Sequence, residues 1–337
     1  MKVLLVDHLE ADFSMALTIM GLRDLLGEDQ VIDFPVKGSY RGRTDTYRLP
    51  PQQVWGVDGS ISAVYKDGTT SPFAWMRPPG PGGPKEWALD EVCSRMGEFS
   101  LVVASVRSFA VEALARIFGR VNLPRLVLVD GEDSSGVKTE IIRQFRPKVY
   151  FKRHLVREEA YRRDSTDVLP LPFAIANLHE ASSPLGPLGS AKVDVCLLGG
   201  SNAPGGKGQF EDAIRRVTQS HVFGHSSYDG MMQAVANSRI AVAPRGHGQD
   251  TLRNFEFLGI EGPLVVVQRH SLVTTDPLVD GQHVAWFDSA TELEAVVRMY
   301  LANESLRVQV AAQGFAFAKE KHTVKARAQY LVERSLA

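Results

Sequence analysis

The chain has 337 residues, of which 44% are hydrophobic and 23% charged, and its formal net charge at pH 7 is −1. This length exceeds the usual size of one hydrophobic core, and the composition is that of a globular protein, so two domains are expected. No apolar run approaches the ~20 residues of a membrane helix. The two cysteines, Cys93 and Cys196, are too few for a disulfide framework or a zinc site. These features favour a cytoplasmic protein.

The first half of the chain alternates between strand and helix patterns. Apolar strands are predicted at residues 2–6, 31–34, 101–104, 126–129 and 148–151. Helices are predicted at residues 13–26, 85–96, 109–118 and 137–143. Residues 47–76 break this alternation with turn signals at Val57-Asp58-Gly59 and Lys66-Asp67-Gly68, which predict a hairpin insertion. Residues 77–84 are rich in proline and glycine and predict a loop.

A second series of strands and helices follows a break rich in Ser, Pro and Gly at residues 181–190. Strands are predicted at residues 193–198, 221–223, 239–243 and 264–267. Helices are predicted at residues 209–217, 229–236, 251–258, 291–301, 304–319 and 324–336. Such alternation implies parallel sheets with helices on both faces. The sequence therefore predicts an α/β protein with two Rossmann-like domains facing a cleft, which is the GT-B arrangement. Their predicted bounds are 1–185 and 190–317, with a C-terminal helix in 318–337 that packs back on the first domain.

The most informative segment is residues 243–256, where an apolar strand runs into a glycine-bearing loop and then into a helix. The loop carries Arg245 and His247, and the helix is expected to begin at Asp250 or Thr251. Arg253 and Glu256 lie three residues apart, on one helix face. Cations and a helix N-terminus suit a diphosphate, and a carboxylate can accept hydrogen bonds from ribose hydroxyls. The segment therefore indicates a nucleotide-sugar site.

The run Arg253-Asn254-Phe255-Glu256, followed by Gly262-Pro263-Leu264-Val265-Val266, resembles the CgeB-type (group 1-like) glycosyltransferases of the GT-B superfamily. The likeness continues through residues 283–287. It implies that Glu256 holds the ribose of the donor. Many retaining enzymes of this architecture carry two Glu residues eight positions apart. Gly248 and Leu264 occupy the corresponding positions here, so the sequence leaves the stereochemical outcome open.

A second glycine-rich loop follows the predicted strand 193–198. It lacks both the dinucleotide-binding order of glycines and the ending of a Walker motif, so a plain flexible loop is one reading. The other reading places it at the phosphates of the donor, since Lys207 comes just before a helix. The predicted donor-binding residues are Gly199, Gly200, Ser201, Lys207, His225, Arg245, His247, Gly248, Arg253 and Glu256.

Two groups of side chains in the first domain can supply a general base. His8 follows the first strand, where Asp12 can orient its imidazole, although a surface histidine in an acidic loop is the alternative. Asp130 and Asp133 follow the strand at 126–129. The predicted catalytic residues are therefore His8, Asp130 and Asp133. The acidic residues can also bind a divalent metal, but transferases of the GT-B type generally use side chains and a helix N-terminus, so a metal-independent enzyme is predicted.

Residues 143–163 contain eight Lys or Arg residues against two Glu residues, a local excess of six positive charges. We place Lys152 and Arg153 on the acceptor side, where they would favour an anionic acceptor, with DNA as the extreme case. A solvated surface with salt bridges is the plainer alternative.

These observations favour a glycosyltransferase that moves a sugar from a nucleotide sugar, such as a UDP-sugar, to a hydroxyl acceptor. The nucleotide sugar is a co-substrate, and no other cofactor is expected. Two alternatives remain: a phage-type transferase that modifies DNA bases, and a non-catalytic protein that binds sugar nucleotides or carbohydrates.

Overall fold

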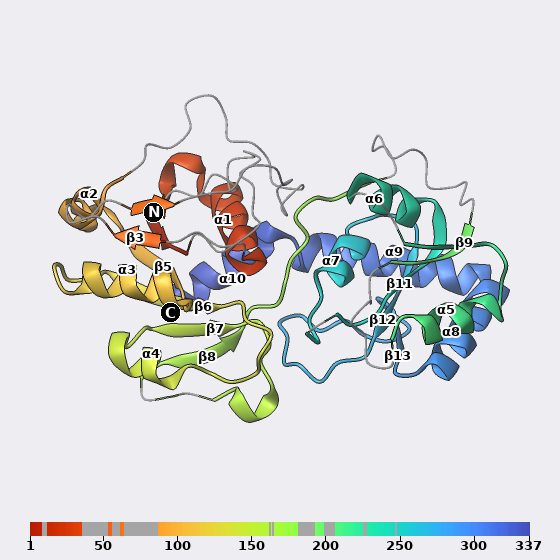
Figure 1. Ribbon diagram of the computed structural model, residues 1–337. Coiled ribbons are helices and arrows are strands. Elements are labelled where there is room, and N and C mark those ends of the chain that lie inside the picture. Colours follow the sequence, from red (N-terminus) through yellow and green to blue (C-terminus); the bar gives the residue numbers. More distant parts are fainter. Residues whose placement is uncertain are drawn as a thin grey trace. The chain divides into compact units, whose positions relative to one another are not determined.

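The computed structural model divides the chain into two compact units (Figure 1). It describes residues 1–8, 12–35, 53–55, 61–63, 87–161, 163, 165–180, 193–198, 206–224, 228–246 and 248–337. The first unit comprises Met1–Pro172 and Val324–Ala337, and the second comprises Phe173–Thr323. The first unit therefore ends before the predicted boundary at residues 185–190, which lies outside the described residues.

The first unit is built on a six-stranded sheet with the order β2-β1-β5-β6-β7-β8, and all of its strand pairs are parallel. The strands are β1 (Val3–Val6), β2 (Val31–Phe34), β5 (Leu101–Ser105), β6 (Arg125–Asp130), β7 (Val149–Lys152) and β8 (Asp167–Pro170). The helices are α1 (Phe13–Leu26), α2 (Leu89–Ser94), α3 (Ser108–Phe118), α4 (Thr139–Phe145) and α10 (Val324–Leu336). The five predicted strands are confirmed, whereas β8 was not predicted.

The predicted hairpin insertion is confirmed by an antiparallel pair, β3 (Gln53–Trp55) and β4 (Ile61–Ala63). Its second turn signal, at residues 66–68, and the proline-rich loop at residues 77–84 lie outside the described residues.

The second unit is built on a five-stranded parallel sheet with the order β10-β9-β11-β12-β13. The strands are β9 (Val193–Leu197), β10 (His221–Phe223), β11 (Ser238–Ala243), β12 (Leu264–Gln268) and β13 (Ala285–Phe287). The helices are α5 (Gly208–Arg215), α6 (Tyr228–Ala236), α7 (Leu252–Leu258), α8 (Ala290–Ala302) and α9 (Glu304–Lys321). Phe210 of α5 packs edge-to-face on Phe287 of β13, with ring centroids 5.4 Å apart, in the core of this unit. The predicted α/β class with two parallel sheets is thus confirmed.

Each sheet has a point where the strand order reverses. In the first unit the chain places β2 on one side of β1 and β5 on the other. In the second unit β10 and β11 flank β9 in the same way. At such a point the loops after the two central strands diverge, which leaves a crevice outside their carboxyl ends where ligands bind. The loops after β1 and β5, and those after β9 and β11, are therefore the expected binding loops.

The C-terminal helix α10 packs against α1 in the first unit, and Figure 1 shows the two helices side by side. Their contact is close at Gly21, where a Cβ atom would lie 2.1 Å from the carbonyl oxygen of Val324. No side chain larger than that of glycine fits at this position unless the backbone of α10 moves.

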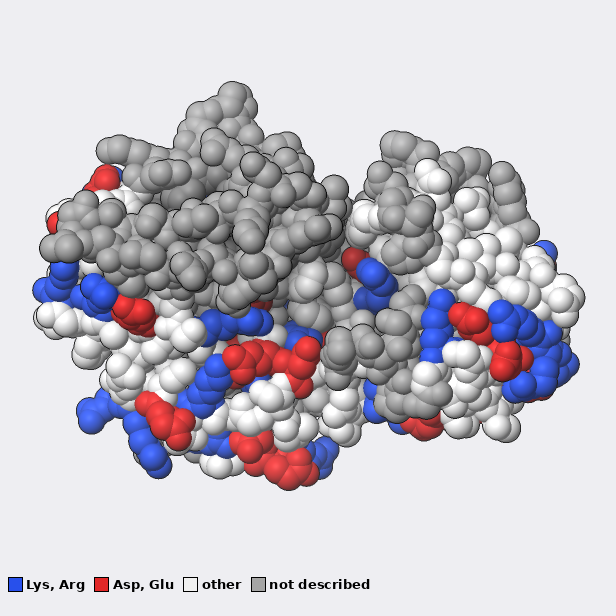
Figure 2. Space-filling view, viewed as in Figure 1, with Lys and Arg blue, Asp and Glu red and all other residues white. Residues whose placement is uncertain are grey.

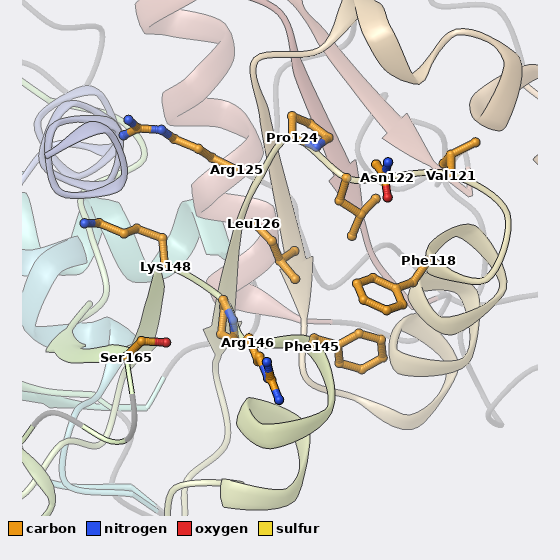
Figure 3. Close-up of a pocket in the computed structure, with 12 residues that line it drawn as sticks. Phe118, Val121, Asn122, Pro124, Arg125, Leu126, Phe145, Arg146, Lys148 and Ser165 are labelled. Carbon is orange, nitrogen blue, oxygen red and sulfur yellow. The ribbon is translucent and has the colours of Figure 1, made fainter.

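The described surface mixes charges of both signs. Figure 2 shows Lys and Arg side chains interleaved with Asp and Glu side chains on the viewed face of each unit. Among the described residues, no helix is both long and apolar enough to cross a membrane. A cavity of about 760 Å³ lies at the amino ends of β6 and β7 (Figure 3).

Candidate functional site

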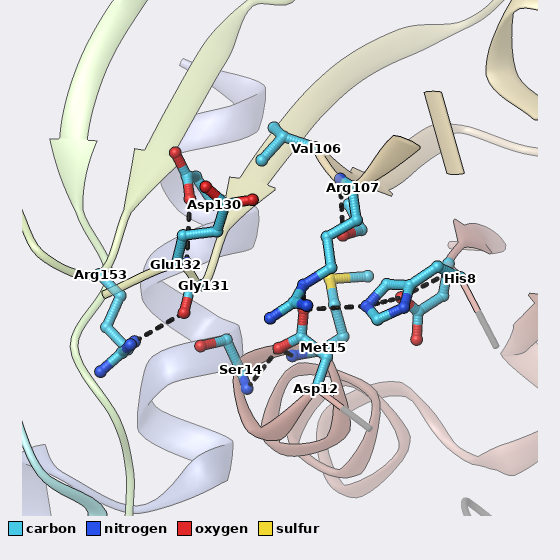
Figure 4. Close-up of polar contacts among 12 residues, drawn as sticks. His8, Asp12, Ser14, Met15, Val106, Arg107, Asp130, Gly131, Glu132 and Arg153 are labelled. Carbon is cyan, nitrogen blue, oxygen red and sulfur yellow. Dashed lines mark hydrogen bonds and ion pairs between the residues drawn. The ribbon is translucent and has the colours of Figure 1, made fainter. Parts of the chain in front are cut away.

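His8 and Asp12 meet at the carboxyl end of β1, as Figure 4 shows. Asp12 is the N-cap of α1, and its Oδ1 accepts hydrogen bonds from the backbone N–H groups of Ser14 and Met15, at 2.9 and 3.2 Å. Its other oxygen, Oδ2, lies 3.3 Å from Nε2 of His8. The capping bonds fix the carboxylate, and the carboxylate in turn orients the imidazole, which is 2% exposed. The expected pairing of Asp12 with His8 is present.

Arg107 is a member of this group that the sequence analysis did not identify. It follows β5, and its Nε lies 3.5 Å from Oδ2 of Asp12. The guanidinium places a positive charge at the reversal point of the sheet, beside the carboxylate that orients His8. Position alone can find this residue: once β5 is known to neighbour β1, the loops after these two strands must converge.

Asp130 and Lys152 form a fully buried ion pair at the carboxyl ends of β6 and β7. The sheet register pairs these two residues, and Lys152 Nζ lies 2.9 Å from Asp130 Oδ2, with neither side chain exposed. Oδ2 also accepts a hydrogen bond from the Tyr150 hydroxyl, and Oδ1 accepts one from the backbone N–H of Glu132 at 3.0 Å. Burial and the neighbouring Asp130 carboxylate raise the pKa of Tyr150, so this hydroxyl stays protonated and donates. Asp130 thus acts as an acceptor inside the protein.

Arg153 also uses its charge internally. Its Nε donates to the backbone oxygen of Gly131 at 3.0 Å, and its guanidinium pairs with Asp133, whose side chain is about half exposed. Both cations are buried and paired inside the protein, Lys152 with Asp130 at the end of β6 and Arg153 with Asp133 in the loop that follows. Their expected place on the acceptor side stays a prediction.

The loop after β6 packs against the N-terminus of α1 at Gly131. A Cβ atom at this position would lie 2.6 Å from Ser14 Oγ and 2.9 Å from Asp12 Oδ1. The loop therefore touches the carboxylate that orients His8. The buried pair of Asp130 and Lys152 holds one end of this loop, so it helps to position Asp12.

The ligand atoms of Asp7, His8 and Asp12 lie within 4.8 Å of one another, so this group has the side chains to hold a metal ion. Two observations weigh against a cation here. Asp12 already accepts two N–H donors, and the Arg107 guanidinium lies beside it. Both interactions satisfy the carboxylate without a metal.

In the second unit, Arg245 follows β11 at the reversal point of the sheet. Its backbone N–H donates to Oε1 of Gln268 on the neighbouring strand, at 3.0 Å. Burial lowers the pKa of its guanidinium, and its buried Nε has no hydrogen-bond partner among the described residues. A buried donor of this kind has lost its hydrogen bonds to water and has gained none in their place. A bound anion would accept a hydrogen bond from it. Gly248 is partly buried in the same loop.

Arg253 and Glu256 pair on α7, and Thr251 occupies the N-cap position of this helix without a capping hydrogen bond from its side chain. Nη1 of Arg253 donates to Oε2 of Glu256, so the two side chains share a helix face. Glu256 is 8% exposed, and its burial raises the pKa of the carboxyl against the opposing effect of Arg253. A buried carboxylate with one partner retains oxygen lone pairs that ligand hydroxyls can use.

The remaining predicted donor-binding residues fall into two groups. Lys207 precedes α5, and its Nζ lies 3.0 Å from Glu211 Oε1, an ion pair along the helix. Gly199, Gly200, Ser201, His225 and His247 lie outside the described residues.

Comparisons with known proteins match this architecture. Residues 187–333 match the model of a family described as Glycosyl transferase-like. The whole chain is similar in fold to the Anabaena protein Alr3699/HepE in complex with UDP, at a TM-score of 0.61 and 11% identity, with 99% of each chain covered. It is also similar to a glycosyltransferase from Rickettsia africae, at a TM-score of 0.57 and 8% identity, with 99% of this chain and 97% of that chain covered. An alpha-glucosyltransferase in complex with UDP and a 13-mer DNA matches at a TM-score of 0.56 and 10% identity. The match covers 99% of this chain and 98% of that chain. The search of curated proteins gives no match.

The chain has a two-sheet α/β fold similar to those of the solved proteins above, and its segment 187–333 matches the glycosyl transferase-like family. This segment contains β11, α7 and the Arg253–Glu256 pair. The resemblance drawn from the sequence is confirmed at the level of the glycosyltransferase class, and the CgeB-type subdivision stays a prediction.

Proposed function

We propose that the protein transfers a sugar from a nucleoside diphosphate sugar to a hydroxyl acceptor, without a metal cofactor. The observation that carries this proposal is the Arg253–Glu256 pair on α7. It follows the β11 loop, at the reversal point of the second sheet, within the segment that matches the glycosyl transferase-like family.

In this proposal, Glu256 accepts hydrogen bonds from the ribose and Arg253 holds the carboxylate in place. Charge-assisted hydrogen bonds of this kind contribute roughly 1.5–3 kcal/mol each. Arg245 stabilises the departing diphosphate, since its buried Nε lacks a partner among the described residues. Lys207 adds a second cation. The complexes of the Anabaena protein with UDP and with UDP-glucose make a uridine diphosphate sugar the first donor to test.

His8 is the proposed base for a transfer that inverts configuration. In the tautomer that donates from Nε2 to Asp12, the lone pair of the imidazole lies on Nδ1, and in this proposal that atom accepts the proton of the attacking hydroxyl. This division of roles follows the general pattern in which a carboxylate orients a histidine base. His8 is a better candidate than Asp130, because the Asp130 carboxylate already has three partners. They are the backbone N–H of Glu132, the hydroxyl of Tyr150 and the ammonium group of Lys152.

The decisive experiment is calorimetry with UDP and UDP-glucose on Arg253→Ala and Glu256→Ala. We expect each variant to lose about tenfold or more in donor affinity, from the loss of at least ~1.5 kcal/mol. The matched control is the pair Arg298 and Glu294 on α8, an exposed Arg–Glu pair whose atoms lie 3.0 Å apart in the same unit. Unchanged donor affinity in both folded α7 variants would refute the assignment.

Further measurements separate the alternatives. Metal independence predicts that a chelator leaves sugar transfer unchanged. Donor binding without transfer or donor hydrolysis would favour the non-catalytic reading. The cations expected at the acceptor, Lys152 and Arg153, each pair with a carboxylate of the protein, so the proposal favours a small-molecule or glycan hydroxyl over DNA. Retardation of duplex DNA that weakens with added salt would reverse that preference.

A further inference from the structure

The cavity at the amino ends of β6 and β7 is separate from the loops described above. The site loops of the first unit lie at the carboxyl ends of its strands, whereas the cavity lies at the amino ends of β6 and β7 (Figure 3). Its volume of about 760 Å³ is in the range of small-molecule sites. Arg125, Arg146 and Lys148 contribute positive charge to its lining, and no carboxylate lines it among the described residues.

One part of the cavity is aromatic. The rings of Phe118, which ends α3, and Phe145, which ends α4, meet edge-to-face with centroids 5.9 Å apart. Phe118 is 51% exposed, so about half of this residue faces solvent. A flat apolar group placed against these rings would cover surface that now faces water.

The positive charges that line the cavity are only partly neutralised by other described residues. Neither Arg146 nor Lys148 has an ion pair among the described residues, and both are exposed. Figure 3 shows Arg125 and Lys148 extending away from the rings, and Arg125 donates to the backbone oxygens of Ser335 and Leu336 at the end of α10. By contrast, Lys152 and Arg153, from the same basic stretch of sequence, are neutralised inside the protein.

The backbone of Arg146 gives an independent indication. It occupies the left-handed conformation, with φ 47°, at the C-terminal end of α4, where its N–H donates to Ile142 O at 2.8 Å. Glycine is the residue that helices usually place in this conformation, because it has no Cβ. An arginine here carries a conformational cost that glycine would avoid, which suggests that the guanidinium is used.

We propose that this cavity binds an anionic ligand that also carries an apolar ring. The ring would pack against Phe118 and Phe145, and a phosphate or carboxylate would pair with Arg146 and Lys148. The site is distinct from the proposed sugar-transfer site and does not depend on it. A ligand of this chemistry would be an effector or an anchored part of a larger molecule.

Calorimetry with three probes tests both halves of this proposal. 1-Naphthyl phosphate has the ring and the anion, inorganic phosphate has only the anion, and 1-naphthol has only the ring. We expect 1-naphthyl phosphate to bind at least tenfold more tightly than either of the other two. Equal binding of inorganic phosphate would overturn the role of the rings, and equal binding of 1-naphthol would overturn the role of the cations.

Variants place the binding in the cavity. Arg146→Gly should weaken 1-naphthyl phosphate at least tenfold, while the unfolding temperature stays the same or rises, because glycine suits this backbone. Phe118→Ser should weaken the same probe with little change in folding, since the ring is half exposed. The control variant is Arg143→Ala, because Arg143 is an exposed cation of α4 that lies outside the cavity lining. Alanine is used at this position in place of glycine because Arg143 is helical. Unchanged affinity for 1-naphthyl phosphate in both Arg146→Gly and Phe118→Ser would refute the site.

Discussion

Removal of one partner from the buried pair of Asp130 and Lys152 should strongly destabilise the first unit. At 2.9 Å and an effective dielectric constant of about 20, the attraction between the two charges is about 6 kcal/mol. Most of this offsets the loss of hydration, so the pair as a whole contributes little. A single charge left buried has no such compensation and costs roughly 3–5 kcal/mol.

The variants Lys152→Met and Asp130→Asn separate these effects. Lys152→Met should fall at the lower end of that range, because Tyr150 and the Glu132 N–H still donate to the Asp130 carboxylate. Asp130→Asn leaves a buried ammonium group, so its cost should be at least as large. In the double variant neither charge remains, and its cost should be well below the sum of the two single costs.

Urea unfolding followed by circular dichroism measures these costs as shifts in the transition midpoint. Arg116→Met is the matched control, because Arg116 pairs with Glu112 at 2.9 Å on the exposed face of α3, and little change is expected there. A midpoint of Lys152→Met equal to that of the original protein would refute the reasoning. Costs that simply add in the double variant would also refute it, since they would show that the two charges are not coupled.

Two further predictions concern single positions. Burial raises the pKa of Glu256, so its charged form is penalised in the fold above that pKa, and the penalty disappears as the pH falls below the ordinary value of 4.5. Glu256→Gln should therefore raise the thermal unfolding temperature at pH 7, and the gain should shrink toward pH 4; a gain independent of pH would contradict this account. Gly314→Ala should lower the unfolding temperature, although alanine favours helices, because its Cβ would lie 2.0 Å from His283 O. Gly136→Ala is the control, since nothing lies within 4 Å of a Cβ there, and equal unfolding temperatures for the two variants would disprove the clash.

The local patterns of the sequence predict most of the elements. Four elements coincide with their predicted bounds: the strands β2 and β10 and the helices α1 and α10. Two strands escape this reasoning. They are β8, the run Asp-Val-Leu-Pro, in which a charge and a proline obscure the apolar pattern, and β13, the run Ala-Trp-Phe.

Some contacts of the candidate site join residues that are close in the sequence, and others join residues that only the fold brings together. Arg253 and Glu256 are three residues apart, so helix geometry alone brings them together. His8 and Asp12 are also close in the sequence, four residues apart. Arg107 joins the site only through the strand order, which local patterns do not reveal.

The basic stretch shows a different limit. A count of charges along the chain cannot distinguish Lys152, which meets Asp130 across two strands, from Lys148, which has no ion pair among the described residues. Lys148 directly precedes β7, whereas Lys152 is its last residue. Only the sheet register shows that Lys152 is the one that lies opposite a carboxylate. Charge excess in a sequence therefore overestimates the exposed charge wherever parallel strands pair opposite signs.

The return of α10 to the first unit makes that unit discontinuous, with the whole second unit inserted between its two segments. During synthesis the second unit leaves the ribosome before α10 does, and it can complete its own sheet from one continuous segment. The first unit cannot, because the groove on α1 around Gly21 stays uncovered until Val324 and the residues after it emerge. The fold thus imposes an order of assembly in which the inserted unit is able to mature first, and the last helix closes the unit that began the chain.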